Sequence, residues 1–466
     1  MLAVISDLHM EEEASNHIDA DPNLPPIHFS RNLSPKAYRK VFADLANEAR
    51  RNEAQVLRLV LAGDIFELHR TGVWFWENPL RTRPYVSVRE VDESLERVLL
   101  AILAGILAEP ENGKSLEVIR LLAQGQYWDE GELRPFPVPV ELHYLPGNHD
   151  RLANSTPAVR RQVRQMLGLP ATPEPFPHVL YFPEEQTLVR HGQEYDHYNF
   201  ATDLRQRETV PTYLPPNAYG EAPFGDFITV DVASALPFLI RSKFGDGGVQ
   251  ADPVLRAVYE RSIAFDDLRP QQAMLQYLLH MPEKNITPAA VWSVIDKVID
   301  DLLEGIYDDP FLREWMRRMN QTLRPDLLDA VEIVLGLRVW RWTNIPLPLV
   351  QFLSRKAAVG SGDSHPEQFA AREEMIQHGE ARYVIAGHTH HPKIELLRHD
   401  QLGERYYIDT GTWRNRVPAN PDYTAFGSLK TLTYVVVYGA EEDRGGMALG
   451  AKMSSVDIWS GFTQRW

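Results

Sequence analysis

A chain of 466 residues is too long for one ordinary domain, so its length predicts one elaborated domain or two domains, and we expect a core with an insertion. Hydrophobic residues make up 44% of the chain and charged residues 24%, which excludes a disordered or fibrous protein. The formal net charge of -16 disfavours nucleic-acid binding, which depends on Lys and Arg at the phosphates. Because the chain has no cysteine, any metal must be held by His, Asp, Glu or Asn.

The beginning of the chain and its most apolar later stretch bear on location. Residues 1–7 form an apolar run that is too short for a signal peptide. Residues 227–240 contain Asp231 and Pro237 and are too few to span a bilayer, so we interpret them as a buried or interfacial helix. We expect a cytoplasmic protein.

Five short aliphatic or β-branched runs are predicted to be strands, and each ends directly in polar residues. They cover residues 2–5, 56–61, 140–145, 187–189 and 383–386. Helical spacing lies between the first three, at 36–51 and 88–107. This alternation predicts an α/β fold. In open α/β sheets a site forms outside the carboxyl ends of the strands, so the polar residues should converge.

The pattern changes from about residue 196 to residue 365. Helical candidates dominate there, at 254–265, 289–304, 310–319 and 327–335. Strand-like runs return at 393–397, 406–408 and 431–437 and can complete the core sheet. We therefore expect a core at 1–195 and 366–466, interrupted by a large helical insertion or cap at 196–365.

The predicted strand ends carry five motifs rich in His, Asp and Asn. They are Asp7-Leu-His9, Gly63-Asp64-Ile-Phe-Glu67, Gly147-Asn148-His149-Asp150, His191-Gly192 and Gly387-His388-Thr-His390. Singly, each has a structural explanation: Asp7 could cap a helix, and a lone His such as His191 is more often a structural residue. All five together, in this order and each at a strand end, indicate a metal site of oxygen and imidazole ligands.

This set resembles the signature of the calcineurin-like metallophosphoesterase superfamily, D-x-H, G-D-x-x, G-N-H-D, H and G-H-x-H, over residues 1–195 and 366–466. The resemblance implies a four-layer α/β/β/α sandwich that holds two divalent metal ions. It assigns one ion to Asp7, His9, Asp64 and His390, and the other to Asp64, Asn148, His191 and His388, with Asp64 as the bridge. Such ligands suit Mn, Fe or Zn, and the carboxylates favour Mn.

The activity implied is hydrolysis of a phosphate monoester, diester or pyrophosphate by a metal-bridging hydroxide. Two cations about 3.5–4 Å apart need a shared anionic ligand and acidify the water between them. By the resemblance, His149 protonates the leaving oxygen or stabilises charge in the transition state. Asp150 either orients His149 or caps a helix. Asn148 and Arg151 are candidate substrate-binding residues, although Arg151 could instead form an exposed salt bridge.

Glu67 stands where the purple acid phosphatase branch of the superfamily has a metal-binding tyrosine, so we expect no Fe(III)-tyrosinate site. The motifs around Glu67 and His149 are locally similar to bacterial members near the UDP-diacylglucosamine pyrophosphohydrolases of lipid A synthesis. In the main branch of that subfamily the position of His149 is usually arginine, and the insertion is shorter. The substrate of that subfamily is therefore not transferred to this chain.

Two aromatic clusters lie close to the motifs. The first follows Glu67 and contains His69, Arg70, Trp74, Phe75 and Trp76, whose aromatic rings either contact a leaving group or pack under the insertion. The second, at 338–356, is basic and aromatic, which is typical of a membrane surface, an amphiphilic pocket or a buried interface. We expect a phosphorylated small-molecule or amphiphilic substrate, and the oligomeric state stays open.

Two other functions compete with hydrolysis of a small phosphate ester. A non-catalytic scaffold of the same fold would bind a partner through the insertion. Its sequence mark would be lost ligands, whereas here all seven ligand positions carry competent residues. A nuclease is opposed by the acidic charge of the chain.

Overall fold

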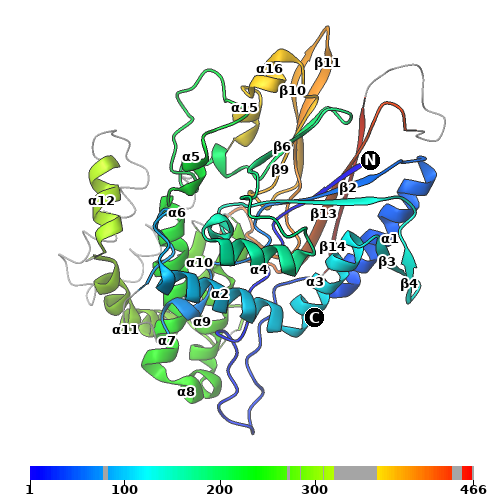
Figure 1. Cartoon of the computed structure of the whole chain (residues 1–466). Helices are drawn as coiled ribbons and strands as arrows, with labels where there is room; N and C mark the ends of the chain where they lie inside the picture. The colour runs from blue at the N-terminus through cyan, green and yellow to red at the C-terminus, as the bar shows by residue number, and fades with distance from the viewer. Residues whose placement is uncertain are drawn as a thin grey trace.

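The computed structural model describes residues 1–76, 82–269, 273–283, 285–307, 309–319, 365–442 and 454–463. The larger of its two main sheets has seven strands in the order β5-β2-β1-β13-β12-β8, with β14 also paired to β13 (Figure 1). The strands of this sheet are β1 (Leu2–Ile5), β2 (Leu57–Ala62), β5 (Val140–Leu145), β8 (Leu268–Arg269), β12 (Asn415–Pro418), β13 (Leu429–Tyr438) and β14 (Ser455–Thr463).

The smaller main sheet has five strands in the order β10-β11-β9-β7-β6. Its strands are β6 (Val179–Phe182), β7 (Thr187–Arg190), β9 (Tyr383–Ala386), β10 (Lys393–Asp400) and β11 (Gly403–Asp409), and a separate hairpin joins β3 (Gln126–Asp129) to β4 (Glu132–Pro135). One buried cluster contains Val4 and Val60 of the larger sheet together with Val189 and Ile385 of the smaller sheet. The two main sheets therefore pack against each other, and all five strands predicted ahead of the motifs are confirmed.

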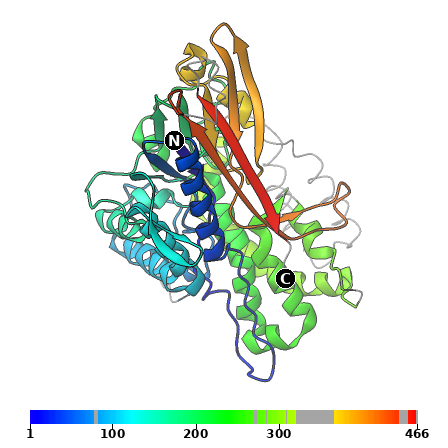
Figure 2. The same cartoon turned by 90° about the vertical axis from the view of Figure 1, so that its right-hand side faces the viewer.

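Helices cover the other face of each main sheet. Alternation along β1 turns Ala3 and Ile5 away from the smaller sheet, into a cluster that also contains Leu45 of α1 and Leu99 of α2. The helices packed in this cluster are α1 (Pro35–Arg51), α2 (Glu93–Ala108), α3 (Pro110–Ala123) and α4 (Pro157–Leu167). In Figure 2, α1 lies beside β13 and β14. The smaller sheet packs against α5 (Pro216–Gly220), α15 (Pro366–Ala370) and α16 (Glu374–His378). The molecule is thus a mixed α/β protein.

Local sequence explains where these helices begin. Tyr38, Val41, Phe42 and Leu45 recur at helical spacing, and all four are buried, which confirms α1. Helix α2 was predicted to begin at residue 88 but begins at Glu93. The side chain of Asp92 accepts a hydrogen bond from the Leu95 amide and so caps the start of this helix. Helices α3 and α4 were not predicted.

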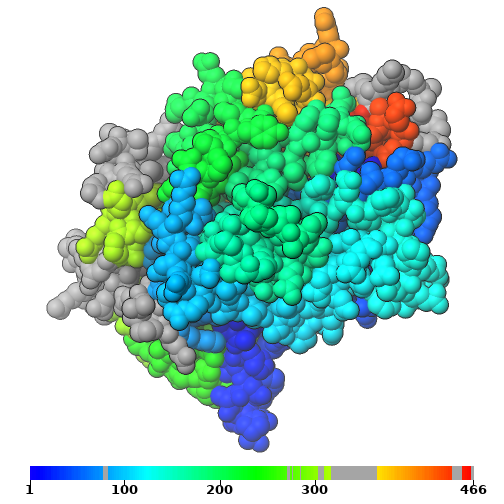
Figure 3. Space-filling model, in the orientation of Figure 1, coloured from blue at the N-terminus to red at the C-terminus, as the bar shows by residue number. Residues whose placement is uncertain are grey.

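Where the structure describes the insertion, it is mostly helical, and the predicted helices at 254–265, 289–304 and 310–319 are confirmed. Besides α5, the helices in this part are α6 (Phe224–Phe227), the π-helix η4 (Ile228–Ser234), α7 (Ala235–Phe244), α8 (Asp246–Ala251), α9 (Pro253–Ile263), the 3-10 helix η5 (Ala264–Asp267), α10 (Met274–Leu279), α11 (Pro288–Tyr307) and α12 (Pro310–Met319). The predicted helix at 327–335 lies outside the described residues. Ile18 and Ile27, in the N-terminal loop that projects at the bottom of Figures 1 and 3, join the hydrophobic cluster of these helices.

The insertion is built into the core, a feature that the sequence pattern did not indicate. Its residues Leu268 and Arg269 form β8, which pairs in parallel with β12 of the larger sheet. Phe224, Phe227 and Leu312 belong to the cluster that covers the larger sheet. The segment predicted as a helical cap therefore also supplies an edge strand and core side chains.

The apolar stretch in the insertion is buried, as predicted for residues 227–240. The segment Pro216–Phe244 has the length and composition of a membrane span, but 61% of its most apolar window is buried inside the protein. Val230, Ala233 and Ile240 have exposed fractions of 2% or less. This burial is consistent with a soluble protein.

Two buried arginines of the N-terminal part fasten the insertion to the core. Arg31 donates to Glu11 Oε1 at 2.7 Å and to the carbonyl oxygen of Ile263 at 2.9 Å. Arg70 donates to the carbonyl oxygen of Ser262 at 2.7 Å and pairs with Asp266 at 2.9 Å. Both guanidinium groups thus bind the end of α9, and their charges are balanced by carboxylates.

Replacing Arg31 with alanine is expected to lower the free energy of unfolding by about 3–5 kcal/mol, because Glu11 would stay buried without its partner. Urea unfolding followed by circular dichroism measures the change. The control is Lys40→Ala, which removes an exposed ion pair with Asp44 and should change the free energy by about 1 kcal/mol or less. Equal effects of the two substitutions would contradict a structural role for the Arg31 pair.

Candidate metal centre

The five sequence motifs meet at the carboxyl ends of β1, β2, β5, β7 and β9. Five of the seven predicted ligands have positive φ values, which non-glycine residues rarely adopt. These values are 54° for Asp7, 43° for His9, 52° for Asp64, 74° for His388 and 59° for His390. Sharp turns directly after the strands therefore turn these side chains into the centre. Such left-handed residues concentrate at functional sites.

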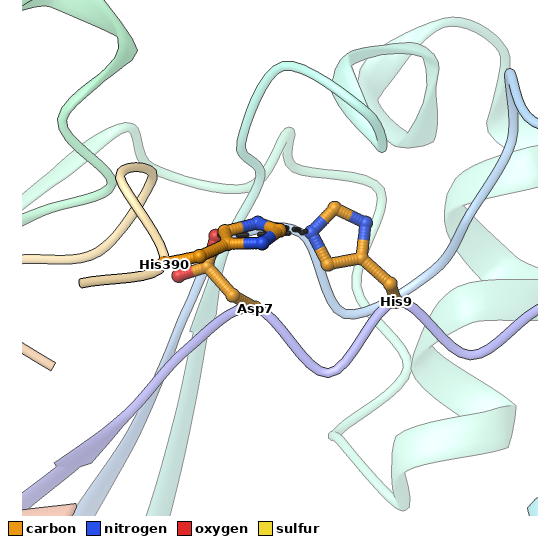
Figure 4. A group of neighbouring side chains, drawn as sticks. All are labelled: Asp7, His9 and His390. Carbon is orange, nitrogen blue, oxygen red and sulfur yellow. Dashed lines mark hydrogen bonds and ion pairs between the residues drawn. The ribbon is translucent and has the colours of Figure 1, made fainter. Parts of the chain in front are cut away.

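The first group of candidate ligands consists of Asp7, His9 and His390, which lie side by side in Figure 4. Their ligand atoms all lie within 4.8 Å of one another. His390 Nε2 is 3.3 Å from Asp7 Oδ1, and it faces His9 Nε2 at 3.0 Å. His9 is oriented from behind, because its Nδ1 contacts Glu67 Oε2 at 3.0 Å. Two imidazole nitrogens and one carboxylate oxygen thus converge.

The second group consists of Asp64, His191 and His388. His191 Nδ1 donates to the carbonyl oxygen of Ala62 at 2.8 Å, so its Nε2 carries a lone pair when the ring is neutral. That nitrogen is 3.1 Å from Asp64 Oδ2, which is also an acceptor. Two acceptors that face each other require a proton or a metal cation between them.

The ring of His388, like that of His191, is held at one nitrogen by an acceptor, which here is a carboxylate. Its Nε2 contacts Asp196 Oδ2 at 3.1 Å, and its Nδ1 contacts Asn148 Oδ1 at 2.9 Å. A ring hydrogen on Nε2 leaves Nδ1 as an acceptor opposite the amide oxygen of Asn148. Metal-binding histidines typically donate their second N–H to a carboxylate or a carbonyl in this way. The structure thus brings all seven predicted ligands into two adjoining groups.

Two residues of the centre were missed as site residues in the sequence. Glu67 contacts the Nδ1 atoms of both His9 and His149, the latter at 2.9 Å, and forms a third group of possible metal ligands with them. The sequence could have indicated this role, because Glu67 lies three residues after Asp64 in the same motif. Asp196 stands where the sequence pattern placed the start of the insertion, so that boundary hid its contact with His388.

The structure gives Glu67 one of the two roles predicted for Asp150, that of orienting His149. Asp150 accepts hydrogen bonds from the amides of Ile65 and Gly147, at 2.8 and 2.6 Å, and from the Tyr144 hydroxyl at 2.8 Å. Its carboxylate therefore holds two motif loops together, and it does not orient His149. Nor does it fit the alternative of a helix cap, since its side chain does not cap the 3-10 helix that follows, η2 (Arg151–Asn154).

The expected phosphate clamp at Arg151 also differs in the structure. Arg151 is 5% exposed, and its guanidinium donates to Asp226 Oδ2 at 2.6 Å and to the carbonyl oxygen of Gly220 at 2.8 Å. It is neither an exposed salt bridge nor a group that faces the candidate ligands. Arg151 instead joins the core to the start of the insertion.

The electrostatic field of the centre favours positive charge. Burial would raise the pKa of Asp7, but His191 and His390 outweigh burial and hold this pKa well below its usual value. Burial would lower the pKa of His149, but Glu67 and Asp64 raise it to about 10. His191 behaves likewise beside Asp64 and Asp7, with a pKa of about 10. A field that holds protons on imidazoles is the field that would hold divalent cations.

Glycines of the motifs leave room for the ligands. A Cβ atom on Gly147 would lie 2.7 Å from His191 Nε2 and closer still to Asp64 Oδ1. A Cβ atom on Gly387 would overlap the side chains of Asp7 and Ser6. Gly147 and Gly387 are therefore steric requirements of the centre itself.

The first aromatic cluster packs under the insertion, one of its two predicted roles. Trp74 is fully buried, and Phe75 stacks on Phe238 of α7 with ring centroids 5.0 Å apart. Trp76 is 38% exposed and lies beneath the Arg241 guanidinium. The second aromatic cluster, at 338–356, lies outside the described residues.

Replacing Gly147 with alanine is expected to weaken Mn²⁺ binding by about 10- to 100-fold, because the added Cβ atom would displace His191 and Asp64. A loss of this size is typical when groups that position metal ligands are removed. Isothermal titration with Mn²⁺ measures the affinity. The control is Gly247→Ala in α8, where an added Cβ meets no atom within 4 Å. Wild-type affinity in the Gly147 variant would show that the centre does not bind metal through Asp64 and His191.

No protein-family model matches the chain, and no curated protein matches it either. What the part of the chain described here shows by itself is a set of buried His, Asp and Glu groups that can hold metal ions.

Proposed function

We propose that the protein is a hydrolase of phosphate esters that uses two divalent metal ions. The observation that carries this proposal is the pair of opposed acceptors at His191 and Asp64, with the second ring nitrogen of His191 held by a carbonyl oxygen. Asp64 and Asp7 raise the pKa of His191 to about 10, so that a proton on Nε2 satisfies this contact, and a divalent cation bound there would take the place of that proton. The motif resemblance links such a centre to phosphate-ester hydrolysis.

The same proposal covers the fold. We assign the core to the four-layer α/β/β/α sandwich of the calcineurin-like metallophosphoesterases. The support is the buried cluster between the two main sheets, together with the helices packed on the outer face of each sheet. We also propose a cytoplasmic location and a phosphorylated small-molecule substrate.

In this proposal Asp7, His9, Asp64 and His390 hold one ion, and Asp64, Asn148, His191 and His388 hold the other. Asp64 Oδ2 lies 3.7 Å from His9 Nε2 and 3.1 Å from His191 Nε2, which supports its role as the bridge. Mixed oxygen and imidazole ligands suit Mn²⁺. When bound, the ions would stabilise charge on the phosphoryl oxygens and acidify a water molecule.

His149 is the residue proposed to transfer a proton to the leaving oxygen. Its Nδ1 contacts Glu67 and its amide donates to Asp64 Oδ1 at 2.8 Å, so both the ring and the backbone are fixed. The ring nitrogen left to face a substrate is Nε2. The His149 side chain is 16% exposed, whereas Glu67 is fully buried. His149 can thus reach a substrate, whereas Glu67, which orients the His149 ring, cannot.

The substitutions Asp64→Asn and His388→Ala are each expected to remove most bound Mn²⁺ and nearly all hydrolysis, because one weakens the bridge and the other opens the second metal site. Elemental analysis and a panel of phosphate monoesters, diesters and pyrophosphates measure the two effects. Asp44→Asn on α1 is the surface control. Full occupancy by two ions in both variants would overturn the ligand assignment. A fully loaded wild-type protein that hydrolyses no substrate would favour the non-catalytic scaffold.

His149→Ala is expected to keep its metal ions and to lower kcat by about 10²–10⁴-fold, the range for general acid–base residues. Glu67→Gln should lower both kcat and Mn²⁺ affinity, since Glu67 contacts His9 as well as His149. Metal content and kcat are measured for both variants. Loss of metal in His149→Ala would identify His149 as a ligand instead.

A further inference from the structure

Two arginines from different parts of the chain lie on one face of the β8–β12 pair. These strands run parallel, with Leu268 opposite Val417 and Arg269 opposite Pro418. Side chains alternate along a strand, so Arg416 shares its face with Pro418. Arg269, from the insertion, therefore lies on the same face as Arg416, from the core.

Both guanidinium groups contact the loop that carries His388 and His390. Arg269 Nε donates to the carbonyl oxygen of Thr389, between the two histidines, at 3.4 Å. Arg416 donates from one terminal nitrogen to His391 Nδ1 at 3.2 Å. The arginine pair therefore lies beside the first group of candidate ligands.

The two guanidinium groups lack carboxylate partners. Neither forms an ion pair among the residues that the structure describes, because Asp266 is paired with Arg70 and Asp267 with Arg414. Asp409, the carboxylate that acts on Arg416, accepts instead from the hydroxyl groups of Thr389 and Tyr407. The Nε atom of Arg416 is buried without a hydrogen-bond partner.

The positive charges of Arg269 and Arg416 also repel each other. Burial and, after it, the positive charge of Arg416 lower the pKa of Arg269 to about 10, although Asp267 and Asp266 act in the opposite direction. Burial also lowers the pKa of Arg416. Two partly desolvated cations that repel each other are stabilised by an anion, which guanidinium groups bind through charged hydrogen bonds.

We propose that Arg269 and Arg416 form a subsite for a second anionic group of the substrate, attached to the phosphoryl group that is cleaved. The inference rests on the proposed function for the position of that phosphoryl group, while the anion site itself rests on the arginine pair. The insertion then selects substrates through one side chain of β8. A substrate with one phosphate and neutral substituents leaves the subsite without a ligand.

Three hydrolysis-resistant probes separate the subsite from the metal centre. Methylphosphonate carries one anionic group, methylenediphosphonate adds a second phosphonate, and phosphonoacetate adds a carboxylate. Isothermal titration of the manganese-loaded protein is expected to show at least about tenfold tighter binding of a two-anion probe than of methylphosphonate. The probe with this advantage shows whether the second group is a phosphate or a carboxylate.

The variants Arg269→Gln and Arg416→Gln should lose this tenfold advantage and bind methylphosphonate within about threefold of wild type. Arg398→Gln, at an exposed arginine of β10, is the control and should keep it. Thermal unfolding and metal content confirm that the variants are folded and loaded. The subsite is overturned if the advantage survives in both variants, or if all three probes weaken equally.

Hydrolysis of bis(4-nitrophenyl) phosphate, which has no second anionic group, distinguishes the two proposals. Both variants should still hydrolyse it, because neither arginine is a candidate metal ligand. A wild-type protein without this or any other phosphate-ester activity, but with arginine-dependent binding of the two-anion probes, would refute the proposed function and leave the subsite standing. Normal hydrolysis with no arginine-dependent binding would refute the subsite alone.

Discussion

The centre depends on one constraint: buried hydrogen-bond acceptors are directed at one another and need positive charge between them. Asp7, Asp64 and Glu67 are buried carboxylates with lowered pKa values, so they stay ionised. The ring nitrogens that face them are oriented by acceptors on their other side, the Ala62 carbonyl oxygen behind His191 being the clearest case. Without cations, this concentration of negative charge in a low-dielectric interior would be strongly unfavourable. Strand ends, glycines and hydrogen-bonded loops hold the acceptors in place.

The sequence predicted much of the core because hydrophobic periodicity and strand burial coincide there. The strands at 2–5 and 140–145 have the predicted bounds, since each is a continuous apolar or alternating run that ends at a polar motif. The seven candidate ligands could be located in the sequence because each motif directly follows such a run. The strand bounds and the motif positions depend on residues close together in the sequence, so they could be predicted without a structure.

The remaining features depend on contacts between distant residues. Strand β8 has only two residues, so no period can mark it, and its pairing with β12 joins positions about 150 residues apart in the sequence. The prediction that Asp150 orients His149 rested on their adjacency in sequence, whereas in the fold it is Glu67 that contacts the His149 ring. Asp196 was missed because the change from strand-like to helical pattern near residue 196 was interpreted only as the start of the insertion. The contact of Asp196 with His388 joins residues far apart in the sequence.

The left-handed backbone at the ligand positions sets a limit on how stable this protein can become. A non-glycine residue in that region costs of order 1–3 kcal/mol. Glycine would relieve the cost, but at His9, His388 and His390 it would also remove a candidate ligand. Substitutions that stabilise the fold must therefore come from elsewhere, because the backbone at these positions can relax only if their imidazole side chains are lost.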